Sequence, residues 1–185
     1  EQAVDIGISK ASKLGVAITA LQNAGHLGRI GDWAERAAGQ GLVSIHMVNV
    51  RGSLLVAPFG GIDRRMSTSP FCAGIPMKDG EDPIIFDMAP SVVAEGKALV
   101  ALKGGKPLPE DSIVTETGEI TGDPGPLYGD TKQGEFPSAS NGSGALRAFG
   151  DHKGSGLNFL MEMMAGALTG SGCAAVHNEP MRKFC

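Results

Sequence analysis

Short apolar runs separated by glycine and proline are the feature that most limits how this chain can fold. Five of these runs have the length and composition of β-strands, at residues 16–21, 42–50, 54–57, 71–76 and 83–88. Apolar residues recur at helical spacing in four further segments, at residues 4–14, 30–38, 91–103 and 155–168. Few of these segments alternate as regular β-α-β units. The pattern therefore predicts an α/β (α+β-like) domain built on a sheet of mixed strand direction.

Glycine sets the spacing of these runs. The chain has 28 glycines among 185 residues without a short repeat. Such a content is typical of tight turns and of loops whose backbone approaches a ligand closely, and a fold that is simply rich in loops is the alternative. Proline and glycine interrupt the segment 104–148 most often. This segment predicts a partly mobile excursion over the surface, with a hairpin at Thr117-Gly118.

Charge and cysteine content exclude several classes of protein. The net charge is −4 and the basic residues are scattered, which argues against a nucleic-acid-binding surface. Cys72, Cys173 and Cys185 lie far apart without a C-x-x-C motif, so we expect no disulfide framework, no metal site and a reducing cytoplasm. No signal peptide is visible, and no apolar run reaches the ~18 residues of a membrane span. We therefore expect a soluble protein.

His26 is the first candidate for chemistry. It lies in a Gly-His-Leu-Gly run at 25–28, between a predicted strand and a predicted helix. The glycines let a substrate approach closely, and an imidazole titrates near the pH at which a hydroxyl proton is removed. A structural role is the alternative for this histidine. For His46, inside a predicted strand, and His177, in a polar tail, we expect only structural roles.

A second candidate run joins two arginines to two hydroxyl side chains. Arg64 and Arg65 follow a glycine turn at 60–61, and Thr68 and Ser69 come shortly after them. A guanidinium can bind a substrate carboxylate through two parallel hydrogen bonds, and the hydroxyls add further donors. The alternative is a solvated turn without a ligand.

A third run resembles an anion-binding site at the start of a helix. It passes from a predicted strand into a predicted helix through Asp87, Met88, Ala89, Pro90 and Ser91. Ser91 can cap that helix, the free amides of the first turn attract a phosphate, and Asp87 can accept a ribose hydroxyl. The alternative is that Asp87 only ties down the turn.

A fourth run, at 150–156, places Lys153 among glycines before another predicted helix. Lys153 can neutralise a pyrophosphate there, whereas an exposed lysine at a helix start is the alternative. The run lacks the Gly-Lys-Ser/Thr triplet of a phosphate-binding P-loop. No G-x-G-x-x-G follows a strand in this sequence, so a conventional Rossmann site is unsupported.

The order of the motifs resembles one known family. The motifs are Gly-His-Leu-Gly at 25–28, Val-Asn at 48–49, Ala-Pro-Phe-Gly-Gly at 57–61, Arg-Arg-Met-Ser-Thr-Ser-Pro at 64–70, Phe-Asp-Met-Ala-Pro-Ser at 86–91, Gly-Asp-Pro at 122–124 and His-Lys-Gly at 152–154. In this order and spacing they resemble the type-2 malate/L-lactate dehydrogenases, most of all the hydroxycarboxylate dehydrogenase B branch. The resemblance covers almost the whole chain.

The resemblance implies an NAD(P)-dependent dehydrogenase with a mixed-sheet NAD(P)-binding domain that is not a classical Rossmann fold. It implies hydride transfer between NAD or NADP and a 2-hydroxyacid or 2-ketoacid, such as malate, lactate or an aryl-lactate, and usually a homodimer. His26 matches the histidine assigned as proton acceptor, and Arg64 and Arg65 remain candidates for the substrate carboxylate. Positions that match cofactor contacts are Asn49, Thr68, Asp87, Met88, Ala89, Pro90, Ser91, His152, Lys153 and Gly154.

The chain departs from the family pattern in three places. Ser69 stands where the family usually has asparagine, and Pro90 where it has threonine. The family's amino-terminal substrate-binding region and its carboxy-terminal part have no counterpart in residues 1–185, which predicts the cofactor-binding core of a longer architecture. A non-catalytic nucleotide-binding or dimerisation module is therefore the alternative function. A hydrolase using His26 or His152 is a weaker one, because the sequence places no nucleophile beside either.

Overall fold

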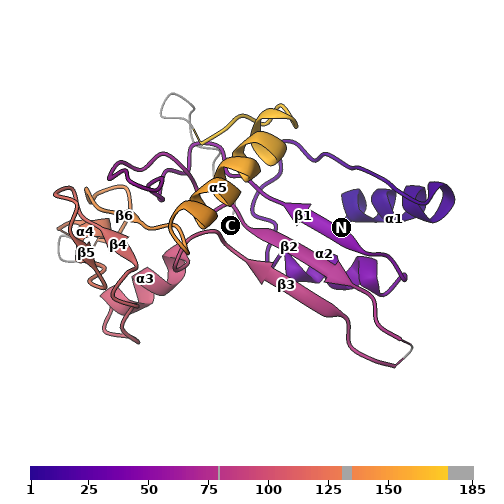
Figure 1. The fold of residues 1–185 in the computed structure, drawn as a ribbon, viewed down its shortest axis with the longest axis horizontal. Coiled ribbons are helices and arrows are strands. Elements are labelled where there is room, and N and C mark those ends of the chain that lie inside the picture. Colours follow the sequence, from indigo (N-terminus) through magenta and orange to yellow (C-terminus); the bar gives the residue numbers. More distant parts are fainter. Residues whose placement is uncertain (79, 131–134, 175–185) are drawn as a thin grey trace.

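Two small antiparallel sheets and the helices around them make up the fold (Figure 1). The structure is a computed structural model that describes residues 1–78, 80–130 and 135–174, so His177 and Cys185 lie outside the described residues. The first sheet has the strand order β1-β2-β3. Its strands are β1 (Ser44–Met47), β2 (Phe71–Ile75) and β3 (Ile84–Met88).

Helix α2 (Gly31–Ala38) covers one face of this sheet because β2 presents small side chains there. A Cβ at Gly74 would lie 2.9 Å from both the Cβ and the carbonyl oxygen of Ala34, so only glycine admits the close contact. The opposite face is apolar but open, because Ile45, Ile84 and Phe86 are each more than half exposed. The first sheet thus has one packed face and one bare face.

The second sheet has the order β5-β4-β6 and contributes Ile113 and Leu146 to the larger core. Its strands are β4 (Ile113–Val114), β5 (Ile120–Thr121) and β6 (Ala145–Leu146), and α3 (Glu95–Leu102) and α4 (Gly125–Tyr128) lie beside them. Tyr128 is fully buried, and its hydroxyl donates to the Glu95 carbonyl oxygen at 3.1 Å. The polar end of the largest core side chain is therefore satisfied.

The remaining helices lie outside these two cores. Helix α1 (Gln2–Leu14) has no buried residue and contacts α2 through an ion pair of 2.6 Å between Asp5 and Arg36. Helix α5 (His152–Met161) continues as a π-helical turn, η1 (Glu162–Ala167), and Figure 1 shows α5 passing between the two sheets. Among the described residues, none of the helices is long and apolar enough to cross a bilayer.

Several predictions of local structure are confirmed. The helices at 4–14 and 30–38 and the strands at 71–76 and 83–88 are all present. The hairpin at Thr117-Gly118 joins β4 to β5, with a φ of 86° at Gly118 that favours glycine. The expected mixed strand direction is not present in the described part: every pair of named strands there is antiparallel, and parallel pairing is limited to one bridge between Val56 and Leu146.

The predicted strand at 16–21 is wrong. This segment is not a strand, and Val16 and Ile18 are 72% and 92% exposed. Its β-branched side chains favour an extended backbone, but a strand exists only where a second strand satisfies its amides and carbonyls. Within the described residues no strand pairs with it.

Two further expectations differ from the structure. The predicted helix start at Ser91 is wrong, because α3 begins at Glu95 and the Ser91 hydroxyl donates instead to the Val93 carbonyl oxygen at 2.9 Å. The segment 104–148, expected to run over the surface, forms β4, β5, α4 and β6 and buries side chains such as Ile113 and Leu127 completely. Its glycines and prolines mark turns between short buried pieces, which composition cannot distinguish from an exposed loop.

Candidate active site

One cavity of about 380 Å³ gathers three of the predicted site residues, His26, Asn49 and Thr68. They come from three distant segments: the loop before α2, the residues after β1 and the loop before β2. Ala165 of η1 and Thr169 beyond it add to the wall. An imidazole, an amide and a hydroxyl around a largely apolar cavity are typical of a site for a small molecule.

A backbone hydrogen bond fixes the proton of the His26 ring. The amide of Gly28 donates to Nδ1 of His26 at 3.0 Å. Because Nδ1 accepts this bond, the neutral ring carries its proton on Nε2. His26 can therefore donate a hydrogen bond from Nε2 to a ligand, and it can accept a proton at Nε2 only as the other neutral tautomer, in which Nδ1 carries the proton and the bond from Gly28 is broken.

The side chain of Asn49 is held from two sides. Its Nδ2 donates to Oε2 of Glu162 at 3.2 Å, and its Oδ1 accepts from the Ser69 hydroxyl at 3.2 Å. A carboxylate can only accept hydrogen bonds, so the amide nitrogen must point to Glu162. Sequence reasoning did not select Glu162 as a site residue. The available signal was a carboxylate in the middle of the most apolar late stretch of the chain.

Asp87, at the end of β3, contacts the loop of His26 indirectly. Its Oδ2 accepts a hydrogen bond of 2.7 Å from the amide of Gly31, the first residue of α2. A carboxylate at this position satisfies a free amide and suits the positive end of the helix dipole. Asp87 thereby ties the loop before α2 to the first sheet.

The other predicted cofactor contacts form a second group around the start of α5. The Phe149 amide donates to the Pro90 carbonyl oxygen at 3.2 Å, and Ser91 forms a bridge with Ala148. This pairing places residues 90–91, which follow β3, beside residues 148–149, which lead into His152, Lys153 and Gly154. His152 and Lys153 are exposed, whereas a Cβ on Gly154 would lie 2.2 Å from the Phe149 carbonyl oxygen. Only glycine allows that packing.

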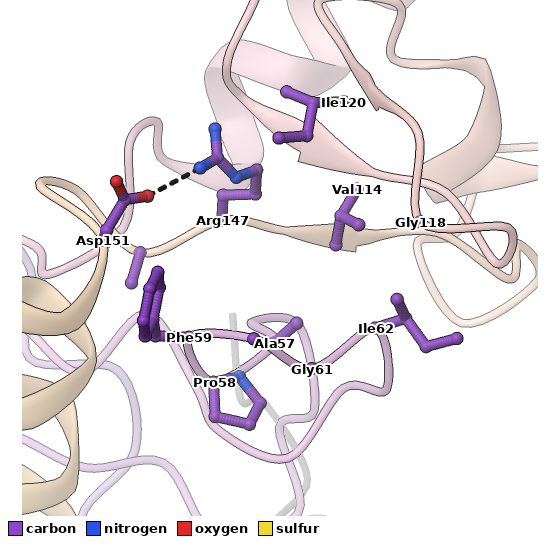
Figure 2. A pocket seen from close by; sticks show the side chains of 12 residues that line it. Ala57, Pro58, Phe59, Gly61, Ile62, Val114, Gly118, Ile120, Arg147 and Asp151 are labelled. Carbon is purple, nitrogen blue, oxygen red and sulfur yellow. Dashed lines mark hydrogen bonds and ion pairs between the residues drawn. The ribbon is translucent and has the colours of Figure 1, made fainter.

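A second cavity, of about 310 Å³, lies beside this group (Figure 2). Arg147 and Asp151 form an ion pair of 2.6 Å at its edge, and Phe59 and Ile62 line it together with β4 and β5 residues. The Phe59 ring also makes an edge contact with His152, at 5.9 Å between centroids. The cavity is mainly apolar, with its nearest charges already paired to each other.

Neither predicted substrate arginine lines the cavity that holds His26. Arg65 is exposed and paired with Asp63 at 2.7 Å. Arg64 donates to four backbone carbonyl oxygens instead, those of Leu127, Ala139, Gly142 and Gly144. Its guanidinium thus fastens the segment between α4 and β6 to the body of the protein.

His46 occupies a structural position. Its Nε2 lies 3.0 Å from the Ser44 hydroxyl, and burial lowers its pKa although the charge of Asp87 acts in the opposite direction. Within the ranges that the structure describes, no group of three histidine, cysteine, aspartate or glutamate side chains could hold a metal ion.

Comparison with known proteins identifies the family. Residues 1–183 match the sequence profile of the family described as Malate/L-lactate dehydrogenase. The chain is 40% identical over 181 residues, 98% of its length, to hydroxycarboxylate dehydrogenase B of Escherichia coli O157:H7. It is 39% identical over 166 residues, 89% of its length, to L-lactate dehydrogenase of Cupriavidus necator. A solved Escherichia coli structure, assigned provisionally as a malate/lactate dehydrogenase, matches 96% of the chain with a TM-score of 0.83 at 38% identity.

The chain belongs to the malate/L-lactate dehydrogenase family of oxidoreductases. The family and the α/β fold predicted from the motifs are confirmed. The chain spans less than half of each relative: 46% of hydroxycarboxylate dehydrogenase B, 44% of L-lactate dehydrogenase and 46% of the solved structure.

Proposed function

We propose that this chain serves an NAD(P)-dependent oxidoreductase that transfers a hydride between NAD or NADP and a 2-hydroxyacid or 2-ketoacid. Malate, lactate and aryl-lactates are the acids of this class that we propose. The observation that carries the proposal is the meeting of His26, Asn49 and Thr68 in one cavity. The family supports the reaction, and the names of the two relatives support the substrate class.

The cavity suits the nicotinamide end of the cofactor. Ser67, which also lines it, has a buried hydroxyl without a hydrogen-bond partner in the described part of the chain, and Thr68 adds a second hydroxyl. A carboxamide on a flat ring can satisfy such groups while its ring covers apolar wall. When bound, the nicotinamide supplies or accepts the hydride.

We assign the rest of the dinucleotide to the second group of residues. Lys153, exposed at the start of α5, neutralises a pyrophosphate there together with the positive end of the helix dipole. Asp87, Met88, Ala89, Pro90 and Ser91 lead toward this position and, with His152 and Gly154, form the remaining wall of the proposed site.

His26 holds the proton that moves in the proposed reaction. In the direction of ketoacid reduction, the imidazolium form of His26 donates its Nε2 proton to the substrate oxygen and is left neutral, with its proton on Nδ1. In the direction of oxidation, this neutral form accepts the proton of the substrate hydroxyl at Nε2. Both steps need the proton on Nδ1, so the hydrogen bond from the Gly28 amide opens during the reaction. Arg65 stays the candidate for the substrate carboxylate, whereas the Arg64 donors are already engaged.

Nucleotide binding and turnover test the proposal separately. We expect saturable binding of NADH or NADPH, followed by nicotinamide fluorescence, and at least a tenfold weaker affinity for Lys153→Ala, about the value of one desolvated charge contact. We expect His26→Asn to keep the affinity but to slow NADH oxidation by a panel of 2-ketoacids about 10²-fold or more. Lys97→Ala, an exposed lysine outside the proposed site, serves as the control.

A folded chain that binds neither nucleotide would contradict the proposal and favour the non-catalytic scaffold. Binding without turnover with every ketoacid would favour the nucleotide-binding module.

We further propose a homodimer, for which the bare apolar face of the first sheet offers a surface. A reducing cytoplasm suits the free thiol of Cys72.

A further inference from the structure

Helix α5 and the turn η1 bury two polar side chains besides Met161 and expose several apolar ones. Asn158 and Glu162 are 0% and 5% exposed, whereas Phe159, Leu160 and Leu168 are all exposed. The apolar residues predicted for this helix are present, but many of them face outward. The buried side of the helix therefore serves contacts that apolar side chains cannot make.

The buried polar side holds three loops that carry predicted site motifs. Ser155, Asn158 and Glu162 follow one another at spacings of three and four residues, which places them on one face; we name them the polar stripe. Their contacts are Phe59 N to Ser155 Oγ at 3.0 Å, Asn158 Nδ2 to Ser67 O at 2.7 Å, and Asn49 Nδ2 to Glu162 Oε2 at 3.2 Å. One helix face thus gathers segments that are distant in sequence.

A glycine lies beside the contact between Glu162 and Asn49. A Cβ on Gly166 of η1 would lie 2.6 Å from Asn49 Nδ2, so a larger residue there would displace the amide. Glu162 Oε2 also accepts the Ala174 amide at 2.8 Å. On its other side, Asn49 accepts from Ser69, which is fully buried with a φ of 25°. The Asn49 amide is held in one orientation at the cavity wall.

The polar stripe makes the folded protein less stable than apolar side chains of similar volume could. Oε1 of Glu162 and Oδ1 of Asn158 are buried and have no hydrogen-bond partner in the described residues. A buried acceptor left without a partner is destabilising, and an apolar side chain of similar volume is often as stable or more so. Polar groups at these positions are therefore explained by what they orient rather than by the stability that they add.

We propose that Glu162 is a positioning residue of the active site, acting through Asn49. This inference rests on the proposed function and deepens it: the carboxylate sets the direction of the Asn49 amide toward the bound nicotinamide nucleotide. Glu162 does not touch the ligand. Its removal should therefore weaken affinity no further once the Asn49 amide is gone.

A double-mutant cycle tests this coupling. Glu162→Leu removes both acceptor oxygens, and Asn49→Ala removes the amide that Glu162 orients. We expect each change to weaken binding of the nucleotide that the wild-type chain binds by about tenfold or more, and we expect the double variant to be no weaker than Asn49→Ala. Glu162→Gln keeps an acceptor for Asn49 and should restore affinity to within about twofold of wild type. Glu119→Leu, an exposed acid in the β4–β5 turn, is the matched control.

The outcomes separate a positioning role from a structural one. Losses that add in the double variant, or Glu162→Leu affinity equal to wild type, would overturn the inference. So would a Glu162→Gln variant as weak as Glu162→Leu. If Glu162→Leu does not fold, Glu162→Met replaces it in the cycle, because methionine also lacks both acceptor oxygens but keeps an unbranched stem.

A second measurement keeps the inference apart from the proposed function. In proton–nitrogen correlation NMR of the chain without nucleotide, Glu162→Leu should shift the side-chain amide signals of Asn49, and Glu119→Leu should not. If wild type binds no nucleotide but these signals shift, the proposed function fails while the orienting contact stands. Unchanged signals overturn the positioning role whatever the nucleotide does.

Discussion

Replacing Arg64 by methionine tests whether this arginine is a structural clamp. The guanidinium is half-buried and donates to four carbonyl oxygens, at 2.6 Å to Gly144, 2.8 Å to Gly142 and 2.9 Å to Leu127, with Ala139 as the fourth. Methionine keeps much of the unbranched stem but none of the donors. The Leu127 carbonyl belongs to α4 and the other three lie between α4 and β6, so the change should loosen this segment first.

The size of the effect follows from the contacts. A hydrogen bond from a charged donor contributes about 1.5–3 kcal/mol, which for four bonds gives about 6–12 kcal/mol as an upper estimate. Two effects reduce it: water can reach some of the freed carbonyls, and the substitution removes a charge whose burial lowers the Arg64 pKa. We therefore expect Arg64→Met to lower the free energy of unfolding by about 3 kcal/mol. Arg64→Lys should lose about half of that, because one ammonium cannot reach the same four acceptors.

Urea unfolding followed by circular dichroism measures this loss, and the neighbouring arginine supplies the control. Arg65 and its partner Asp63 are both more than half exposed, so Arg65→Met should cost less than about 1 kcal/mol. A loss for Arg64→Met no larger than that for Arg65→Met would refute the clamp. Normal stability with a weakened affinity for 2-ketoacids would instead support the substrate role predicted from the sequence.

Two further predictions concern packing and pH. Gly74→Ala should lower the free energy of unfolding by about 1–3 kcal/mol, because the new Cβ would lie 2.9 Å from Ala34. Gly156→Ala, with nothing within 4 Å of the new Cβ, should instead stabilise α5 by about 0.5–1 kcal/mol. Equal melting temperatures of the two variants in calorimetry would contradict the packing argument. Burial raises the pKa of the Cys72 thiol from 9.0 to about 11, so the folded state holds this proton more tightly than the unfolded state. The resulting stability is present below pH 9 and is lost as the pH rises toward 11. Cys72→Ala should flatten the decline of the unfolding free energy in this window, and an unchanged slope would argue against it.

Sequence patterns predicted the elements whose packing is local. Helix α2 and strands β2 and β3 carry regular apolar spacing and end at glycine or charged turns, so their own residues specify them. The segment 16–21 has a comparable pattern but forms no strand. Its conformation depends on hydrogen bonding to another strand, and no property of the six residues themselves reports whether such a strand lies beside them.

Candidate site residues were predictable to different degrees. His26, Asn49 and Thr68 were selected from short motifs and from their order along the chain, and the structure brings them to one cavity. Arg64 was selected for its charge alone. Charge indicates what a guanidinium can bind but not whether backbone carbonyls already occupy its donors, which depends on how the segment 127–144 folds back on it.

Glu162 escaped prediction because an amphipathic pattern assumes that the apolar side of a helix is the buried one. In α5 and η1 the site loops supply backbone and amide groups that need partners, so the buried side carries polar side chains besides the buried Met161. Loops that carry ligand-binding residues cannot satisfy all of their own hydrogen bonds, and side chains of the helix packed against them supply the missing donors and acceptors. A helix near a candidate site that buries a carboxylate with an acceptor to spare is therefore better explained as a support for that site than as a packing fault. This explanation requires that changes in the polar stripe affect ligand affinity more than they affect folding.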